Sequence, residues 1–206
     1  GEDRFRQAGA GVSYCGTCDA PFFKGKTVVA VGGGNTAVEE TLHLAKFARK
    51  VHMVHRRREF RASKILVEEL TAAVETEKVI ELRLDTVVTA IEGGDHVEFV
   101  RTRNVNTGDE GRIDCDGVFI FIGMVPNTKF LEGVLDLDEA GLIRADLPYL
   151  CTSMPGVFVA GDCREDNLAQ LATACGDGVN AALRVKRYLK DPRWWHYRPR
   201  TRDEQE

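Results

Sequence analysis

Residues 15–37 read CGTCDAPFFKGKTVVAVGGGNTA, and they join a cysteine pair to an apolar run and a glycine-rich loop. The run TVVAV, residues 27–31, is short and continuous, which is typical of a parallel strand buried on both faces. The loop GGGNTA follows it directly. One short stretch therefore pairs a dithiol with the kind of loop that holds phosphate groups.

Predicted helices and strands alternate after this stretch. Apolar spacing predicts a helix over residues 38–50, a strand over 51–54, a helix over 63–75 capped by Ser63, and a strand over 78–88. This β-α-β-α-β order predicts a parallel sheet. From residue 85 apolar and polar residues alternate, with turn signals at Gly93-Gly94 and at 106–108, which predicts an antiparallel meander. Residues 117–123 form another apolar run and predict a buried strand.

A second segment follows the sequence GMVPNT, residues 123–128, where we place a domain boundary. Residues 155–162 predict a strand and then a loop, and residues 170–189 predict a helix. The remaining residues predict an extended tail held by Trp194 and Trp195. The fold class is therefore α/β, with a Rossmann-like three-layer domain first.

The composition excludes several classes of protein. The chain has 206 residues, enough for one large domain or two small ones, with 43% hydrophobic and 29% charged residues. A net charge of −4 argues against a nucleic-acid partner. No apolar run is long enough to span a membrane, and no signal peptide is recognisable. The chain begins at Gly1 without an initiating Met, which leaves a processed product or a fragment open.

Six cysteines are present, and only Cys15 and Cys18 form a motif. A single C-x-x-C lacks the four ligands of a structural zinc site, and the histidines do not supply them, so we predict no metal site. The other four lie among apolar or small residues and are predicted to be buried fillers: Cys115, Cys151, Cys163 and Cys175.

The glycine-rich loop fits the pattern G-x-G-x-x-A at Gly32, Gly34 and Ala37. These small residues permit a tight turn, a close approach of the backbone to a pyrophosphate, and close packing of helix on strand. The pyrophosphate would rest on the helix N-terminus. The alternative is a glycine turn in another doubly wound sheet.

The end of the second strand, HRRREFRAS, distinguishes between nucleotides. NAD sites place an acid there, but this segment clusters Arg56, Arg57, Arg58, Arg61 and Lys64 around the single acid Glu59. Guanidinium groups bind phosphate oxygens in pairs, so the cluster predicts NADP(H). The alternative is a solvated charged loop.

The cysteine pair favours redox chemistry. Outside secreted proteins, C-x-x-C is more often redox-active or metal-binding than structural, although a structural disulfide is the alternative. Asp19 follows Cys18 directly and could relay a proton to a leaving thiolate. Nicotinamide transfers hydride, so a flavin would have to connect it to a disulfide.

The stretches GVSYCGTCDAPFFKGKTVVAVGGGNTAVEE, HRRREFRASKIL, GMVPNT, PGVFVAGD and ATACGDG together resemble the bacterial-type, low-molecular-weight NADPH-dependent thioredoxin reductases. The resemblance covers about residues 4–190. It implies NADPH and FAD as cofactors, thioredoxin or a thioredoxin-like dithiol protein as partner, a homodimer when complete, and a cytoplasmic location. It also implies that Cys18 faces the flavin, that Cys15 attacks the partner's disulfide, and that Asp19 supplies the acid.

The resemblance assigns the domains and the cofactor residues as well. Residues 1–122 would be the NADP-binding domain, residues 123–190 the C-terminal part of a discontinuous FAD-binding domain, and residues 191–206 a tail. The implied NADPH residues are Gly32, Gly33, Gly34, Asn35, Thr36, Ala37, His55, Arg56, Arg57 and Arg61. The implied FAD residues are Gly123, Gly161, Asp162, Gln170, Leu171 and Ala172.

Two departures from the family and two alternatives accompany this assignment. The family's first glycine loop, before the dithiol, has no counterpart here, so we expect FAD binding to need that half. Ala169-Gln170 stands where the family often has Arg-Gln. In the family the NADPH domain rotates so that dithiol and nicotinamide take turns, and the implied hinges lie near residues 1–9 and 123–127. The alternatives are a related flavin-dependent disulfide oxidoreductase or oxidase with another partner, and a non-catalytic NADPH-binding module.

Overall fold

The computed structural model describes residues 1–7 and 9–198. The chain divides into two compact units, one spanning Gly1–Gly123 and one beginning at Met124.

A five-stranded parallel sheet forms the centre of the first unit. Its strands, in the order β1-β8-β2-β3-β4, are β1 (Val12–Ser13), β8 (Gly117–Phe121), β2 (Thr27–Gly32), β3 (Lys50–Val54) and β4 (Ile80–Arg83). Every neighbouring pair is parallel. The last of these strands in the chain, β8, lies between β1 and β2, so it connects the segment before the cysteine pair to the rest of the sheet.

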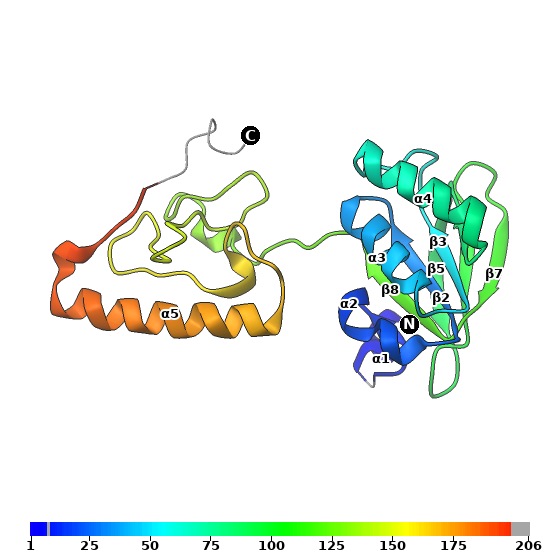
Figure 1. The fold of residues 1–206 in the computed structure, drawn as a ribbon, viewed down its shortest axis with the longest axis horizontal. Coiled ribbons are helices and arrows are strands. Elements are labelled where there is room, and N and C mark those ends of the chain that lie inside the picture. The colour runs from blue at the N-terminus through cyan, green and yellow to red at the C-terminus, as the bar shows by residue number, and fades with distance from the viewer. Residues whose placement is uncertain (8, 199–206) are drawn as a thin grey trace. The chain divides into compact units, whose positions relative to one another are not determined.

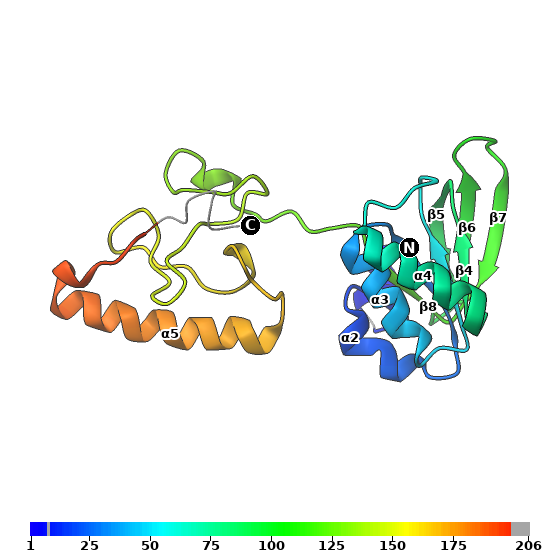
Figure 2. The ribbon, with the colours of Figure 1, turned by 45° about the horizontal axis from the view of Figure 1, so that its top comes forward.

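Two different layers cover this sheet (Figures 1 and 2). Figure 2 shows helices α3 (Asn35–Ala45) and α4 (Lys64–Glu77) on one side and the antiparallel meander on the other. The meander strands are β5 (Thr86–Glu92), β6 (Phe99–Asn104) and β7 (Glu110–Asp114). The short helices are α1 (Glu2–Gln7), α2 (Gly16–Asp19) and the 3-10 helix η1 (Ala20–Phe23). The predicted α/β class, with a parallel sheet and a meander, is confirmed.

The central strands are buried on both faces, which explains their unbroken apolar runs. Val28 packs with Leu44 and Leu70 on the helical side, whereas Val29 packs with Val100 on the meander side. Each fully buried aliphatic side chain of this kind stabilises the fold by about 1.5–3 kcal/mol.

The first predicted helix is displaced from its expected range. It begins at Asn35 instead of residue 38 and ends at Ala45 instead of residue 50. The backbone leaves the helix because Arg49 N–H donates to the carbonyl of Lys26 (2.8 Å), which starts the pairing of β3 with β2. The helix predicted over 63–75 is confirmed as α4. Ser63 occupies its N-cap position but makes no side-chain cap.

The strand predicted over residues 78–88 is two strands. Asp85 has a φ of 51° and turns the chain between β4 and β5. β4 stays in the parallel sheet and β5 starts the meander. Apolar periodicity continues through the turn, so the sequence alone does not reveal the break.

The second unit consists mainly of loops, short 3-10 helices and one long helix. Its elements are η2 (Lys129–Leu131), η3 (Gly161–Cys163), α5 (Leu171–Lys190) and η4 (Pro192–Trp194). The helix predicted over 170–189 is thus confirmed. The buried cluster of the unit is small and contains Leu135, Ile143, Ala145 and Val159, and Leu150 and Cys151 are buried as well.

The strand predicted within residues 155–162 is wrong. Phe158 forms one isolated bridge with Cys151, and Gly161 begins η3 with a φ of 77°. A positive φ bends the chain out of an extended path, so the apolar residues pack in a loop instead.

The predicted extended tail begins instead with the 3-10 helix η4, and residues 199–206 lie outside the described chain. Residues 195–198 after η4 have no regular secondary structure, and Trp194 packs edge-on against Tyr149 with ring centres 5.4 Å apart. Trp195 packs in the same way against Phe158 and Tyr188, at 5.0 and 5.4 Å.

The lone cysteines are not all buried fillers. Cys115 and Cys151 are buried as predicted, and burial raises the pKa of the Cys115 thiol to about 12. Cys163 is half-buried. Cys175 is exposed, because it lies on α5, in which the described structure has no buried residue. For Cys175 the prediction is therefore wrong.

Candidate functional site

Three loops at the carboxyl ends of the parallel strands contain the predicted chemical groups. The cysteine pair follows β1, the glycine-rich loop follows β2, and the arginine-rich loop follows β3. Because these strands are parallel, their carboxyl ends lie along one edge of the sheet. Only β8 lies between β1 and β2, so the first two loops start about 10 Å apart. The fold thus gathers the dithiol and the phosphate cradle on one edge.

Cys15 and Cys18 form a disulfide across the single turn of α2, with their Cα atoms 5.3 Å apart. Cys15 is the extended N-cap residue of this turn, and its Sγ accepts a hydrogen bond from the backbone N–H of Cys18 (3.1 Å). Cys15 is half-buried and Cys18 is exposed. A disulfide with one accessible sulfur can exchange with an external thiol.

Ser13 links the half-buried Asp19 to the cysteine turn. Its hydroxyl donates to Asp19 Oδ2 (2.6 Å) and accepts from the backbone N–H of Cys15 (3.1 Å). The structure therefore places the predicted proton-relay carboxylate on the same turn as both cysteines. Sequence reasoning missed Ser13. Its position at the end of β1, two residues before Cys15, was the available signal.

Gly32 and Ala37 form the tight contact that the glycine pattern predicts. A Cβ at position 32 would lie 2.7 Å from the Ala37 Cβ and 2.4 Å from the carbonyl oxygen of Phe121. Gly32 also has a φ of 154°. Larger residues at either position would push α3 away from the sheet.

The N-terminus of α3 faces open space. Gly34 is its extended N-cap residue, no side chain caps the helix there in the described structure, and nothing lies within 4 Å of a Cβ built on Gly34. Asn35 and Thr36 are exposed in the first turn, and Asn35 Oδ1 accepts from the backbone N–H of Ser63 (2.8 Å). An uncapped helix start with open space in front fits an anion such as a pyrophosphate.

The arginine-rich loop is docked onto the glycine-rich loop. The backbone N–H of Arg61 donates to the carbonyl of Gly33 (2.7 Å), and a Cβ on Gly33 would lie 2.1 Å from the His55 ring. The arginine side chains remain exposed at positions 56, 57, 58 and 61. The arginine-rich loop thus lies beside the glycine-rich loop, with its arginine side chains open to solvent.

His55 is buried at the base of this loop. Its Nε2–H donates to the carbonyl of Glu59 (3.0 Å), and its ring stacks on Phe60 with centres 5.2 Å apart. Burial lowers the pKa of His55, and the nearby charges of Arg56, Arg57 and Arg61 lower it further, while the Glu59 hydrogen bond opposes the shift. The neutral imidazole therefore serves as packing that supports the loop.

The second unit contains most of the remaining predicted cofactor residues. Asp162 lies in η3 and lines a cavity of about 330 Å³ together with apolar side chains that include Met124 and Leu142. Gln170 is the N-cap residue of α5, and Leu171 and Ala172 are exposed in its first turn. Gly161 is buried next to Ala174 of α5, whereas Gly123 ends the first unit with a φ of 97°.

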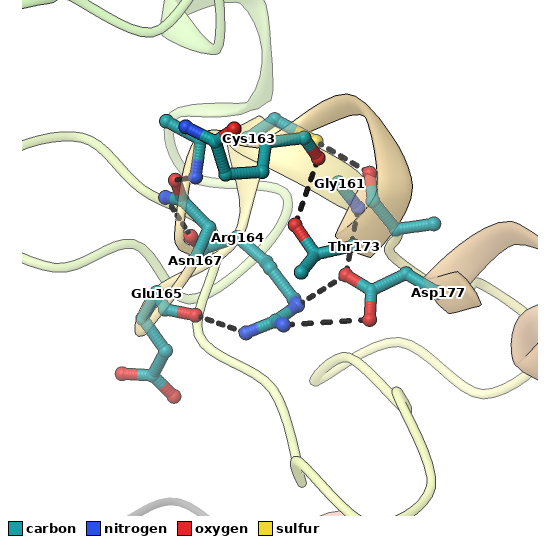
Figure 3. Close-up of polar contacts among 10 residues, drawn as sticks. Gly161, Cys163, Arg164, Glu165, Asn167, Thr173 and Asp177 are labelled. Atoms are coloured by element: carbon teal, nitrogen blue, oxygen red, sulfur yellow. Dashed lines mark hydrogen bonds and ion pairs between the residues drawn. The ribbon is translucent and has the colours of Figure 1, made fainter. Parts of the chain in front are cut away.

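A polar network joins η3 to α5 (Figure 3). Arg164 Nε donates to Asp177 Oδ2 (2.6 Å), and the backbone N–H of Gly161 donates to the same oxygen (3.0 Å). The two side chains are 13% and 15% exposed. Asn167 Nδ2 donates to the carbonyl of Arg164 (2.7 Å), which closes the loop on itself. Sequence reasoning did not assign Arg164 or Asp177. The GDG in ATACGDG was the available signal for Asp177.

Within residues 1–7 and 9–198, histidine, cysteine and acidic side chains do not gather in threes as a metal ion would require. None of the described helices combines the length and apolar character of a membrane crossing.

Residues 4–178 match the family model described as pyridine nucleotide-disulphide oxidoreductase. Among curated relatives, the chain is 42% identical over 183 residues to a thioredoxin reductase of Mycolicibacterium smegmatis. It is 44% identical over 183 residues to a thioredoxin reductase of Bacillus subtilis (strain 168). Each alignment covers 89% of this chain but only 58% or 57% of the relative, so the chain spans less than two thirds of their length.

Two solved structures of thioredoxin reductases are also similar to this chain. The crystal structure of a thioredoxin reductase from Streptococcus pyogenes MGAS5005 superposes with a TM-score of 0.80 at 41% identity, over 88% of this chain and 58% of that one. A thioredoxin reductase from Giardia duodenalis has a TM-score of 0.80 at 40% identity, over 92% of this chain and 60% of that one.

Proposed function

Because the chain belongs to the pyridine nucleotide-disulphide oxidoreductase family, we propose that it serves in an NADPH-dependent thioredoxin-disulfide reductase. The observation that carries this proposal is the partly exposed Cys15–Cys18 disulfide on the same sheet edge as the glycine-rich loop. The thioredoxin reductases among its relatives support the choice of partner.

The residues of the first unit fit a nicotinamide dinucleotide phosphate. The open space at Gly34 would take the pyrophosphate, and the exposed Arg56, Arg57 and Arg61 would take the 2′-phosphate. Residues 1–122 are accordingly proposed as the NADP-binding domain.

For FAD, the apolar cavity beside Asp162 and the first turn of α5 after Gln170 are chemically suited to part of a flavin dinucleotide. Residues 123–190 are proposed as that part of its site, with Gly123, Gly161, Leu171 and Ala172 as further contacts. Bound together, the cofactors would supply an electron pair from NADPH to the disulfide. The proposal includes a homodimeric assembly and a cytoplasmic location.

Within the chain, Cys15 is proposed to attack the disulfide of thioredoxin, Cys18 to resolve the mixed disulfide, and Asp19 to hold the proton that the leaving sulfur takes up. Two electrons pass from the dithiol to the partner: the partner's S–S bond breaks, its sulfurs gain two protons, and the Cys15–Cys18 bond forms. Ser13 keeps Asp19 beside the turn.

A trapping experiment tests this function on the chain as it exists. Reduced Cys18→Ser and Cys15→Ser variants are mixed with a thioredoxin that retains one active-site cysteine, activated as a mixed disulfide with thionitrobenzoate. Cys18→Ser should form a covalent complex through Cys15, which mass spectrometry locates. Cys15→Ser should form much less, although Cys18 is the more exposed sulfur. Equal trapping of an unrelated activated thiol protein would contradict thioredoxin as the partner.

A nucleotide titration tests the cofactor choice. Arg57→Ala should weaken NADPH binding by roughly ten- to a hundred-fold, since charge-assisted contacts contribute about 1.5–3 kcal/mol each, and should barely change NADH binding. Arg103→Ala, an exposed arginine on β6, is the matched control. A chain that binds NADPH but traps no dithiol partner would be a nucleotide-binding module instead.

A further inference from the structure

Glu40 of α3 packs its carboxylate against the two residues that separate the cysteines. Its Oε1 accepts a hydrogen bond from the Thr17 hydroxyl (3.1 Å). Its Oε2 is buried and, among the residues that the structure describes, finds no hydrogen-bond partner. Burying a carboxylate oxygen without a donor costs free energy, so a role in the redox turn would explain why it lies there.

Gly16 makes this packing possible. A Cβ at position 16 would lie 2.2 Å from Glu40 Oε2. Gly16 belongs to α2 and does not have a positive φ, so the backbone conformation alone does not require glycine. Glycine is required at position 16 because the Glu40 carboxylate approaches it so closely. Gly16 is bonded to Cys15 and Thr17 to Cys18, so this charge lies beside both sulfur-bearing residues.

We propose that Glu40 is a positioning residue of the redox turn. Its carboxylate holds Gly16 and Thr17 against α3, and its negative charge keeps the reduced Cys15–Cys18 pair in the thiol form. A like charge nearby disfavours the thiolate, so both protons taken up on reduction stay on the sulfurs. This inference rests on the proposed redox role of the pair and adds a residue that tunes it.

Several other charged or titratable groups belong to the elements around the turn. They are Asp19, Glu2, Arg6, Tyr14, Glu39 and His43. Asp19 already accepts from Ser13, and Tyr14 donates to Glu2. Exchanging Glu40 alone changes none of these groups, so a difference between variants measures the effect of Glu40.

The charge is tested through the acidity of the reduced pair in the full chain. Dithiothreitol reduces the disulfide by thiol exchange and is itself oxidised to a disulfide. After its removal, alkylation of the peptide that contains Cys15 and Cys18 is followed by mass spectrometry over a range of pH. Glu40→Gln should lower the thiol pKa and raise the thiolate fraction at neutral pH about three- to ten-fold. Glu40→Asp keeps the charge and should retain most of the native behaviour.

Glu39→Gln is the matched control, because Glu39 is the preceding residue of α3 and is exposed. Above the thiol pKa, Glu40→Gln should also be easier to reduce, since thiolate formation stabilises the reduced state. An unchanged thiol pKa in Glu40→Gln, or an equal shift in Glu39→Gln, would overturn the proposal.

The packing is tested by a double exchange, which remains informative if one variant is unstable. Gly16→Ala should lower the thermal midpoint of the first unit, followed by circular dichroism. In a Glu40→Ala background, where the carboxylate is absent, Gly16→Ala should lower the thermal midpoint much less. Equal losses in both backgrounds would show that Glu40 does not hold the turn. If the Glu40 variants behave as expected but thioredoxin is not trapped, only the proposed reductase role is refuted. The two proposals can therefore fail separately.

Discussion

Gly32 and Gly34 lie two residues apart, yet the structure requires them for different reasons. Gly32 combines a φ of 154° with a Cβ position 2.4 Å from a backbone oxygen, so Gly32→Ala should lower the free energy of unfolding by at least about 2 kcal/mol. Gly34 has an ordinary φ of −94° and open space around it, so Gly34→Ala should fold normally. Its methyl group would fill the proposed phosphate cradle and weaken NADPH binding about ten-fold or more.

Thermal unfolding and NADPH titration of the two variants separate these roles. Native affinity in Gly34→Ala would show that the start of α3 holds no pyrophosphate. A native midpoint in Gly32→Ala would contradict the close contact with β8.

His55 makes the stability of the first unit depend on pH. Its pKa is lowered by burial and by the neighbouring arginines, so the unfolded chain binds the proton more readily than the folded chain. The contribution of His55 to the free energy of unfolding is therefore complete above the ordinary histidine pKa of about 6.5. It is lost as the pH falls from there through the lowered pKa. His52, whose pKa burial also lowers, acts in the same direction.

Urea unfolding at about pH 7.5 and about pH 5, followed by circular dichroism, measures this dependence. His55→Gln should reduce the loss between the two. His96→Gln, an exposed histidine outside the strands of the meander, is the control. An equal reduction in both variants would refute the assignment to His55.

At the scale of elements, the Arg164–Asp177 pair is expected to fasten η3 to α5. Removing one partner of this half-buried, hydrogen-bonded pair leaves the other charge uncompensated, so Arg164→Gln should lower the free energy of unfolding by about 1.5–3 kcal/mol. Tryptophan fluorescence during urea unfolding should report the loss. Arg193→Gln removes an exposed ion pair with Asp191 in the same unit and should change the transition little. Equal effects of the two variants on the urea transition would mean that the Arg164–Asp177 pair does not stabilise the contact of η3 with α5.

The same pair gives the second unit a dependence on acid. Arg164 lowers the pKa of Asp177 through its hydrogen bond, so this contribution is complete above the ordinary aspartate pKa and is lost as the pH falls through the lowered one. Asp177→Asn should abolish that part of the acid sensitivity.

The elements that the sequence predicts well are those whose pattern is local. Apolar runs predict β2, β3 and β8, and helical spacing predicts α4 and α5. The break at Asp85 and the early end of α3 are set by pairing with distant segments, which periodicity does not contain. The bridge at Phe158 likewise depends on its partner Cys151 and on nearby glycines with positive φ.

The residues of the candidate site likewise fall into those that a local motif predicts and those that only the fold brings together. Cys15, Cys18 and Gly34 are recognisable because each motif lies within a few residues. Glu40 is not, because its partner Thr17 lies 23 residues away and only the packing of α2 on α3 brings them together. Arg164 and Asp177 are separated by 13 residues and the turn into a new helix.

At the scale of the whole molecule, the two units should unfold separately. The first unit has two large buried clusters around its sheet, whereas the one buried cluster of the second, among the described residues, contains only four buried side chains. Both tryptophans of the chain, Trp194 and Trp195, lie in the second unit. Tryptophan fluorescence should therefore change at lower urea concentration, whereas the circular dichroism, to which the helices of both units contribute, should continue to change at higher urea. Coincident transitions would contradict independent units.

The position of β8 in the sheet has a consequence for the order of events during synthesis. Val12 of β1 pairs with Val118 of β8, so the segment that leads into the cysteine turn has no neighbour in the sheet until β8 has been made. β2, β3 and β4 can associate earlier, since each follows the previous one in the chain. On the ribosome, the cysteines thus emerge well before β8 and settle onto the sheet late, and they remain accessible to cellular oxidants and reductants throughout that interval.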